Sequence, residues 1–140
     1  MTINEGRIDI GTGLVIEPGL TESKFLNSSV GKTATVFVKN GVYCSYKLQD
    51  TNIDGKIFLP VLYFSDGELV EVHLYVETIA GKSWATYSSQ SEMAQKLKND
   101  NWLQKVLGLT PPYIFSWGKI ESVIDQKGGM AFILLRYLKV

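Results

Sequence analysis

The stretch KIFLPVLYFSDGELVEVHLYVE, residues 56–77, decides the fold of this chain. Two apolar runs flank Asp66-Gly67, a pair that suits the positive φ angles of a two-residue hairpin turn. With that turn, Ser65 lies opposite Glu68, and every further pair follows by counting outward. The stretch therefore predicts a long antiparallel hairpin with strands over 56–64 and 68–77.

This register sorts the side chains of the hairpin into two faces. One face is almost wholly apolar and is expected to be the core, whereas the other mixes rings and acids as protein-binding surfaces often do. The alternative is that another element covers the apolar half of the mixed face. The expected core face holds Ile57, Leu59, Val61, Tyr63, Val70, Val72, Leu74 and Val76. The mixed face holds Phe58, Pro60, Leu62, Phe64, Leu69, Glu71, His73 and Tyr75.

Pro60 interrupts the first of these strands. It has no amide hydrogen to donate to a sheet ladder, so its strand is expected to be an edge strand or to bulge there.

Turn and cap signals divide the N-terminal part of the chain. An extended segment over 7–16 ends at residues 17–19, Glu-Pro-Gly. Thr21 is placed to cap a short helix over 22–27, because its hydroxyl can accept a free first-turn amide, and Gly31 closes that element.

Two further hairpins are predicted. Asn40-Gly41 is a favoured turn pair between strands over 33–39 and 42–48. A last hairpin closes the chain, with strands over 113–124 and 130–138.

A principal helix is predicted over 89–107. It begins with the capping box Ser-Gln-Ser-Glu at residues 89–92, and it ends at Gly108, before two consecutive prolines. Trp102 and Val106 lie off the main apolar stripe, so the helix either packs on two sides or bends near 99–101. The stripe consists of Met93, Leu97, Leu103 and Leu107.

Hairpins joined to segregated helices indicate an α+β fold. We expect one domain over residues 1–140, with an antiparallel sheet of six to seven strands. The principal helix and the short N-terminal helix are expected to lie on one face of that sheet.

Composition narrows the classes of function. A net charge of zero argues against nucleic-acid binding, which needs clustered Lys and Arg. The single cysteine, Cys44, excludes an internal disulfide and a Cys-based zinc cluster. Residues 1–13 lack the basic start and long apolar run of a signal peptide. The apolar runs are also far shorter than the ~20 residues that span a bilayer, so a cytoplasmic protein without a membrane role is expected.

Charge is unevenly distributed along the chain. Residues 50–77 contain six acids and one base, whereas residues 82–140 contain eight bases and four acids. An acidic hairpin would attract a partner with a basic surface.

The residues with catalytic potential give no convincing site. His73 shares a face with Glu71 and Glu77, but Glu77 is about 13 Å along the strand from it, too far to ligate the same metal ion. Cys44 lies mid-strand and is expected to be buried and inert. We therefore expect no metal and no cofactor, assign no catalytic residue, and favour a non-enzymatic protein over an enzyme.

A set of turns, aromatic residues and glycines recurs across most of the chain. It consists of Trp102-Leu103, Pro112-Tyr113, and residues 40–43, 63–67, 116–123 and 125–129. With these motifs the chain resembles small bacterial cytosolic proteins of unassigned function, and some proteins of this general size and make-up act as immunity proteins beside toxin genes. The resemblance carries no catalytic residue across and implies a protein that binds and inhibits another protein.

Three functions remain open. The first is a non-catalytic protein-binding module of immunity or inhibitor type. Its partner site is expected at Phe58, Leu62, Glu68, Glu71, His73 and Tyr75. The second is a small-ligand carrier or unrecognised enzyme, with a pocket between sheet and helix. That pocket is expected to be lined by Trp84, Tyr87, Trp102 and Trp117. The third is a homodimer that buries the exposed apolar strand face.

Overall fold

The computed structural model describes residues 3–10, 13–76, 89–125 and 130–138, with the backbone alone at 89–91. These residues form ten strands, three helices and a short N-terminal 3-10 turn, η1 (Ile3–Glu5). The predicted α+β class, antiparallel pairing and single principal helix are confirmed, with more strands than the expected six to seven. The helices are α1 (Glu22–Asn27), α2 (Ser29–Thr33) and α4 (Ser89–Leu107).

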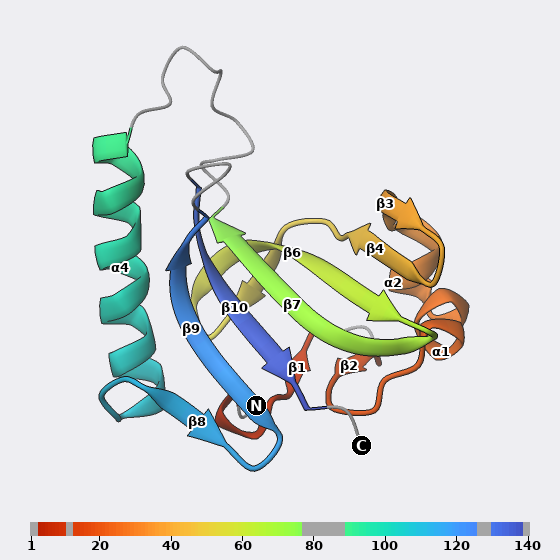
Figure 1. Cartoon of the computed structure of the whole chain (residues 1–140), viewed down its shortest axis with the longest axis horizontal. Helices are drawn as coiled ribbons and strands as arrows, with labels where there is room; N and C mark the ends of the chain where they lie inside the picture. Colours follow the sequence, from red (N-terminus) through yellow and green to blue (C-terminus); the bar gives the residue numbers. More distant parts are fainter. Residues whose placement is uncertain (1–2, 11–12, 77–88, 126–129, 139–140) are drawn as a thin grey trace.

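The main sheet has eight strands and is strongly twisted (Figure 1). Its members are β3 (Thr35–Asn40), β4 (Tyr43–Lys47), β5 (Thr51–Ile53), β6 (Lys56–Ser65), β7 (Glu68–Val76), β8 (Tyr113–Phe115), β9 (Gly118–Ile124) and β10 (Ala131–Tyr137). They lie in the order β3-β4-β6-β7-β10-β9-β8, with β5 paired to β6 beyond the end of β4. A separate small hairpin is formed by β1 (Ile8–Asp9) and β2 (Val15–Ile16).

The additional strands come from three turns that were not predicted from the sequence. The extended segment over 7–16 folds back on itself as β1 and β2, and the expected strand over 113–124 is the hairpin of β8 and β9. Asp54 and Gly55 have φ angles of 48° and 87°, and they join β5 to β6 as a third unforeseen hairpin. That Asp-Gly pair carried the same signal as the turn between β6 and β7.

The predicted Asp66-Gly67 turn is confirmed, with φ angles of 51° and 81°. Ser65 lies opposite Glu68, as expected. The other predicted turn is displaced by one residue, because Asn40 pairs with Tyr43 and leaves the turn to the next two residues.

A β-bulge at Val70 overturns the predicted faces of β6. Phe64 pairs with Leu69, but the next pair is Tyr63 with Glu71, so Val70 has no partner on β6. A one-residue shift exchanges the two faces of a strand relative to its neighbour. The side chains of Val72, Leu74 and Val76 still point to the core, as predicted. On β6 the core side chains are Phe58, Pro60, Leu62 and Phe64, whereas Leu59, Val61 and Tyr63 lie on the opposite face.

Pro60 lies in the interior of the sheet, not on an edge strand as one alternative had it. On one side, β5 pairs with β6 at residues 56–58 and β4 pairs with it at residues 61–65. Pro60 falls between these two pairings, and its carbonyl accepts the amide of Leu48. Its missing amide hydrogen is therefore tolerated at the junction of two short neighbours.

The core lies on one side of the main sheet. Ile8 and Ile16 of the small hairpin, Phe25 of α1 and Leu103 of α4 are fully buried there. The strands supply Phe58, Leu62, Phe64, Val72, Leu74, Ile120, Ile133 and Leu135 to the same core.

The predicted short helix over 22–27 is confirmed as α1. Its cap is also as predicted, because the Oγ1 of Thr21 accepts a hydrogen bond from the amide of Lys24 at 3.2 Å.

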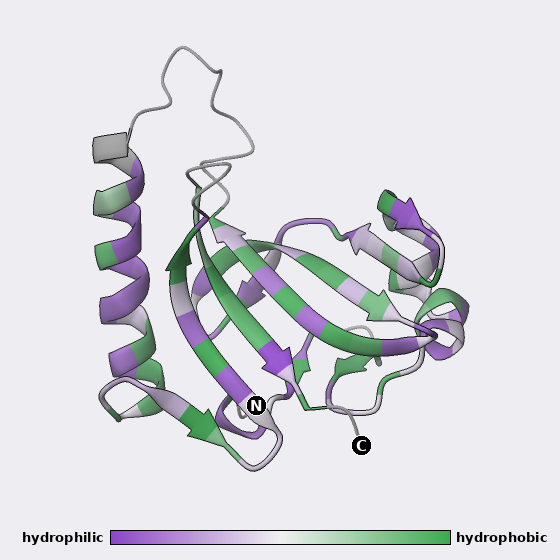
Figure 2. Cartoon of the chain, viewed as in Figure 1, coloured by the Kyte–Doolittle hydropathy of each residue, from purple (hydrophilic) through white to green (hydrophobic). Residues whose placement is uncertain are grey.

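The helix α4 ends as predicted, at Leu107, but its expected apolar stripe is wrong in the first half. Met93 and Leu97 are 55% and 60% exposed, while Glu92 and Asn99 are buried. The Oε1 of Glu92 accepts the amide of Ala131 at 2.9 Å, which satisfies a backbone donor at the start of β10. Hydrophilic residues accordingly dominate much of α4 (Figure 2), and the apolar contact with the core comes from its last turns.

Candidate functional site

The outer face of the main sheet, opposite the core, carries a cluster of four rings. We call Tyr63, His73, Tyr75 and Phe132 the aromatic cluster. They come from β6, β7 and β10, which are neighbours in the sheet. The imidazole of His73 stacks on Phe132 with a centroid distance of 4.5 Å and contacts Tyr63 at 4.2 Å. Tyr75 contacts Phe132 at 5.2 Å, so the rings form one continuous surface.

A polar network crosses the same face beside the rings. Glu71 binds with both carboxylate oxygens: Oε1 lies 2.9 Å from His73 Nε2, and Oε2 accepts from Arg136 Nε at 3.0 Å. His73 Nδ1 lies 3.4 Å from the Tyr75 hydroxyl. When the neutral imidazole donates to the carboxylate through Nε2, its Nδ1 is left to accept from that hydroxyl.

These contacts change the acidity of the groups. The hydrogen bond from His73, followed by the positive charge of Arg136, holds the pKa of Glu71 below its ordinary value against the opposing effect of burial. Burial raises the pKa of Tyr75 and of Tyr63, so both phenols stay protonated at neutral pH. The outer face therefore combines two protonated phenols with one acid whose charge is compensated.

The outer face is more buried than a solvated sheet face. Val61, Phe132 and Leu134 are 2%, 7% and 6% exposed, although they lie outside the core side of the sheet. His73 pairs with Val61 on one side and with Leu134 on the other. Tyr63, His73 and Tyr75 are only partly buried, so these three rings supply the contact area and Phe132 supports them from below.

Two hollows adjoin the aromatic cluster on its β3 side. One has a volume of about 230 Å³ and includes Phe37, Lys47, Val61 and Tyr75 in its lining. The other has a volume of about 250 Å³ and extends from the bulge in β3 to the bulge in β7. Its lining includes Val38, Tyr43, Ser45, Tyr63, Val70 and Glu71. The outer face is thus uneven enough to accept protruding side chains.

The structure brings together part of the predicted partner site. Glu71, His73 and Tyr75 are neighbours on the outer face, as the register of β7 predicted. Phe58 and Leu62 are completely buried in the core, so their expected place on this face is wrong. The bulge at Val70 is the reason, since it exchanges the faces of β6. Glu68 lies at the hairpin tip beside Thr21, away from the rings.

Three members of the site were missed. Tyr63 was assigned to the core by the unbulged register. Phe132 and Arg136 belong to β10, which is distant in the sequence and reaches β7 only through the sheet order. The sequence held no signal for that neighbour. The net negative charge of this face is also smaller than expected, because Glu71 forms an ion pair with Arg136.

The residues expected to line an aromatic ligand pocket do not form one in the described structure. Trp84 and Tyr87 lie outside the described residues. Trp102 packs its edge against Phe58 at 4.9 Å, as part of the core boundary. Trp117 stacks on Phe115 at 5.4 Å, and its Nε1 donates to the carbonyl of Asn4 at 2.8 Å.

A hollow between α4 and the β8–β9 hairpin has other walls. Its volume is about 490 Å³, and its lining includes Lys96, Asp100, Tyr113 and Ser122. Lys96 pairs with Asp100 at 3.1 Å, and the Tyr113 hydroxyl donates to the carbonyl of Leu109. The polar groups of this hollow are engaged within the chain, so it offers few free groups to a ligand.

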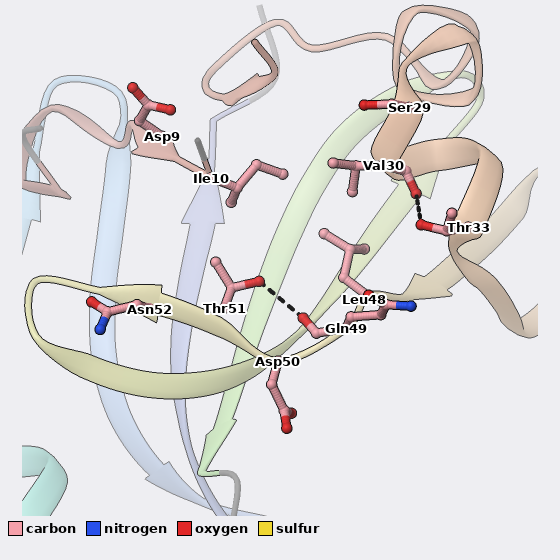
Figure 3. Close-up of a pocket in the computed structure, with 10 residues that line it drawn as sticks. All are labelled: Asp9, Ile10, Ser29, Val30, Thr33, Leu48, Gln49, Asp50, Thr51 and Asn52. Atoms are coloured by element: carbon pink, nitrogen blue, oxygen red, sulfur yellow. Dashed lines mark hydrogen bonds between the residues drawn. The ribbon is translucent and has the colours of Figure 1, made fainter. Parts of the chain in front are cut away.

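A larger hollow of about 500 Å³ lies between β1, α2 and the segment from Leu48 to Asn52. Figure 3 shows Ile10, Val30 and Leu48 directed toward its middle, while Asp9 and Asp50 lie at opposite ends and point away from each other. A ligand site usually has polar groups that converge on one point. This arrangement lacks that convergence.

Other classes of site find no support in the described part of the chain. No group of three His, Cys, Asp or Glu side chains there could hold a metal ion. Among its helices, none combines the length and the apolar character needed to cross a membrane. Comparison of the chain with protein-family models, with curated proteins and with solved structures found no match.

Proposed function

We propose that this protein is a non-catalytic protein-binding module whose recognition surface is the aromatic cluster with Glu71 and Arg136. The observation that carries the proposal is the cluster of four rings beside a paired acid and base on the sheet face opposite the core. Tyr and Arg are enriched among the residues that dominate protein–protein binding energy.

The shape of the surface supports a protein partner more than a small ligand. The two hollows of about 230 and 250 Å³ are smaller than the roughly 300–1,000 Å³ typical of small-molecule pockets. Hollows of this size suit single side chains that protrude from a partner. The rings between them supply a rigid contact area at low entropic cost.

The partner chemistry follows from the charges. Glu71 is compensated by Arg136, so attraction between an acidic hairpin and a basic partner is weaker than composition alone suggested. An immunity- or inhibitor-type role, in which the partner is a toxin or enzyme, is the particular form that we favour. It rests on the resemblance described above and on this surface.

The test compares two triple variants in the capture of partners from a lysate of the source organism. Glu71→Ala/His73→Ala/Tyr75→Ala removes the recognition surface, and Lys98→Ala/Asn101→Ala/Lys105→Ala alters exposed positions of α4. We expect the first to lose a partner that the second and the unmodified protein retain. Circular dichroism and thermal unfolding must show that both variants are folded.

A direct readout is available because His73 is the single histidine of the chain. Its imidazole proton signals can be followed by NMR without further assignment. Addition of the captured partner should shift or broaden them. A partner that binds both triple variants equally, and leaves the His73 signals unchanged, would place the recognition surface elsewhere.

A further inference from the structure

The β3–β4 hairpin exposes five large apolar side chains at one edge of the main sheet. All six residues of β3 are exposed. An exposed apolar edge strand is a template for pairing with another strand. The side chains are Val36, Phe37, Val38, Val42 and Tyr43, with exposed fractions of 54%, 57%, 51%, 58% and 61%.

The backbone of β3 has a free side. Within the described residues, β3 ends the strand order and pairs with β4 alone. Its sequence, TVFVKN, is rich in β-branched and aromatic residues, which favour extended structure. A second strand alongside β3 would therefore satisfy backbone groups and cover side chains together.

The apolar side chains lie on both sides of this edge. Val36 pairs with the buried Tyr46 and lies on the core side, whereas Phe37 and Val38 line the outer-face hollows. A bulge between Val36 and Val38 produces this arrangement. A partner with a flat surface would contact the side chains on only one face of β3, whereas an added strand contacts the side chains on both faces.

The edge is basic. Between Glu22 and Asp50 the chain contains four lysines and no acid. Lys39 on β3 and Lys47 on β4 form no ion pair with any described residue, and neither does Lys32, just before β3. Two copies of this edge would bring lysines against lysines, which disfavours self-pairing. Bulges also limit indiscriminate pairing at sheet edges.

We propose that the β3 edge binds an extended, acidic and apolar segment of another protein, which joins the sheet as an additional strand. Backbone hydrogen bonds supply affinity, and carboxylates opposite Lys39 and Lys47 supply selectivity. Apolar side chains of the segment cover Val36 on one side and Phe37 on the other. This proposal stands on the edge strand and its charges, apart from the aromatic cluster.

The test uses a fluorescent peptide with the repeat Glu-Glu-Val-Val, which places carboxylates and apolar side chains on both faces of an extended strand, with an otherwise identical Lys-Lys-Val-Val peptide as comparator. We expect the acidic peptide to bind with at least about tenfold higher affinity at low salt, measured by anisotropy. Amide hydrogen exchange of the full chain with saturating peptide should slow at residues 35–40. Two further measurements test other occupants of the β3 edge. Binding of the protein to anionic vesicles containing phosphatidylserine tests a membrane surface, and sedimentation of the protein alone tests a second copy of the chain.

Charge reversal sharpens the test. Lys39→Glu/Lys47→Glu should reverse the peptide preference, whereas Lys98→Glu/Lys105→Glu on α4 should leave it unchanged. The triple Ala variant of the aromatic cluster should also keep the preference, which separates this proposal from the previous one. Equal binding of both peptides, protection outside β3, binding to vesicles but not to peptide, or a dimer held by β3 would each overturn the proposal.

Discussion

The two faces of the β6–β7 hairpin differ in what covers them. On the inner face, Leu62 and Leu74 are fully buried beneath side chains from α1, α4 and the small hairpin of β1 and β2. On the outer face, Val61 and His73 are covered mainly by neighbours within the sheet, such as Tyr63 and Phe132. Burial on the inner face therefore requires contacts between the sheet and other elements, whereas the ring contacts of His73 on the outer face come from adjacent strands.

That difference shows why an apolar pattern alone did not identify the core. Both faces of β6 are apolar, with Phe58 and Leu62 on one side and Leu59 and Val61 on the other. A strand with two apolar faces is typical of an interior strand. Its orientation depends on where the pairing shifts, and here one unpaired residue, Val70, decides it.

The largest expected effect comes from deletions that test the bulge. Removal of Val70 should leave the pairs Phe64–Leu69 and Tyr63–Glu71 intact, at a cost of about 1–3 kcal/mol in the free energy of unfolding. Removal of Val72 should shift the following residues by one and turn His73 into the core, so that the protein no longer folds. Circular dichroism and urea denaturation of both variants measure the contrast.

If the variant without Val70 is unfolded while the variant without Val72 is native, the register is wrong. Equal stability of the two variants would also contradict a bulge at Val70, since a regular ladder has no dispensable residue.

A matched pair of leucines compares the faces directly. Leu62→Ala on the inner face should lower the free energy of unfolding by about 2–5 kcal/mol, because it leaves a cavity in a fully buried site. Leu59→Ala on the outer face should cost about 1 kcal/mol, since Leu59 is half-buried and solvent can fill the gap. Urea denaturation measures both. If Leu59→Ala lowered the free energy of unfolding more than Leu62→Ala, the face that carries Leu59 would be the core face.

The pH dependence of stability tests the polar network of the outer face. The pKa of Glu71 is below its ordinary value in the folded protein, so ionised Glu71 stabilises the fold above the unfolded-state pKa of ~4.3. This contribution is lost as the pH falls through the folded-state pKa. Glu71→Gln should cost about 1–2 kcal/mol at pH 7 and progressively less below about pH 4.

Thermal unfolding of the protein and of Glu71→Gln across pH 3–7 gives the measurement. Glu121→Gln is a suitable control, because Glu121 is exposed on the same face and pairs with Lys119 at the surface. A stability difference for Glu71→Gln that persists unchanged at pH 3 would show that ionisation of Glu71 is not its source.

The smallest expected effect concerns a polar group on the core side. Asn99 is fully buried, its Oδ1 accepts from Gln95, and its Nδ2 has no partner among the described residues. Replacing a buried unsatisfied amide by an apolar side chain of similar size is neutral or stabilising. Asn99→Leu should therefore raise the free energy of unfolding by up to about 1 kcal/mol, measured by urea denaturation.

Asn99→Asp provides the opposite control, because it places a charge in the same buried position and should be destabilising. A clear loss of stability in Asn99→Leu would show that this amide has a partner and a structural role.

Much of the fold was predictable because its signals are local. The Asp66-Gly67 turn, the Thr21 cap and the end of α4 before Gly108 each depend on a few adjacent residues with special backbone or capping properties. The inward positions of Val72, Leu74 and Val76 were also correct, whereas the bulge reverses the predictions for Leu69 and Val70. The predicted apolar stripe on α4 was wrong in its first half, because Glu92 and Asn99 are buried there instead of Met93 and Leu97. Glu92 is buried where it accepts a hydrogen bond from the amide of Ala131 in the sheet.

The candidate site was only half predictable. Glu71, His73 and Tyr75 alternate along one strand, so the period of two placed them together. Their partners Tyr63, Phe132 and Arg136 depended on a bulge and on the placement of β10 beside β7. Neither feature has a reliable signal in a single sequence.

The amino-acid sequence by itself therefore determined the Asp66-Gly67 turn, the Thr21 cap, the end of α4 and the class of fold, since these follow from interactions among residues a few positions apart. Tertiary structure alone decided which face of β6 is core, which side of α4 is buried and which rings surround His73. Those outcomes depend on packing between distant segments, where the burial of one side chain is settled only when its neighbours are in place.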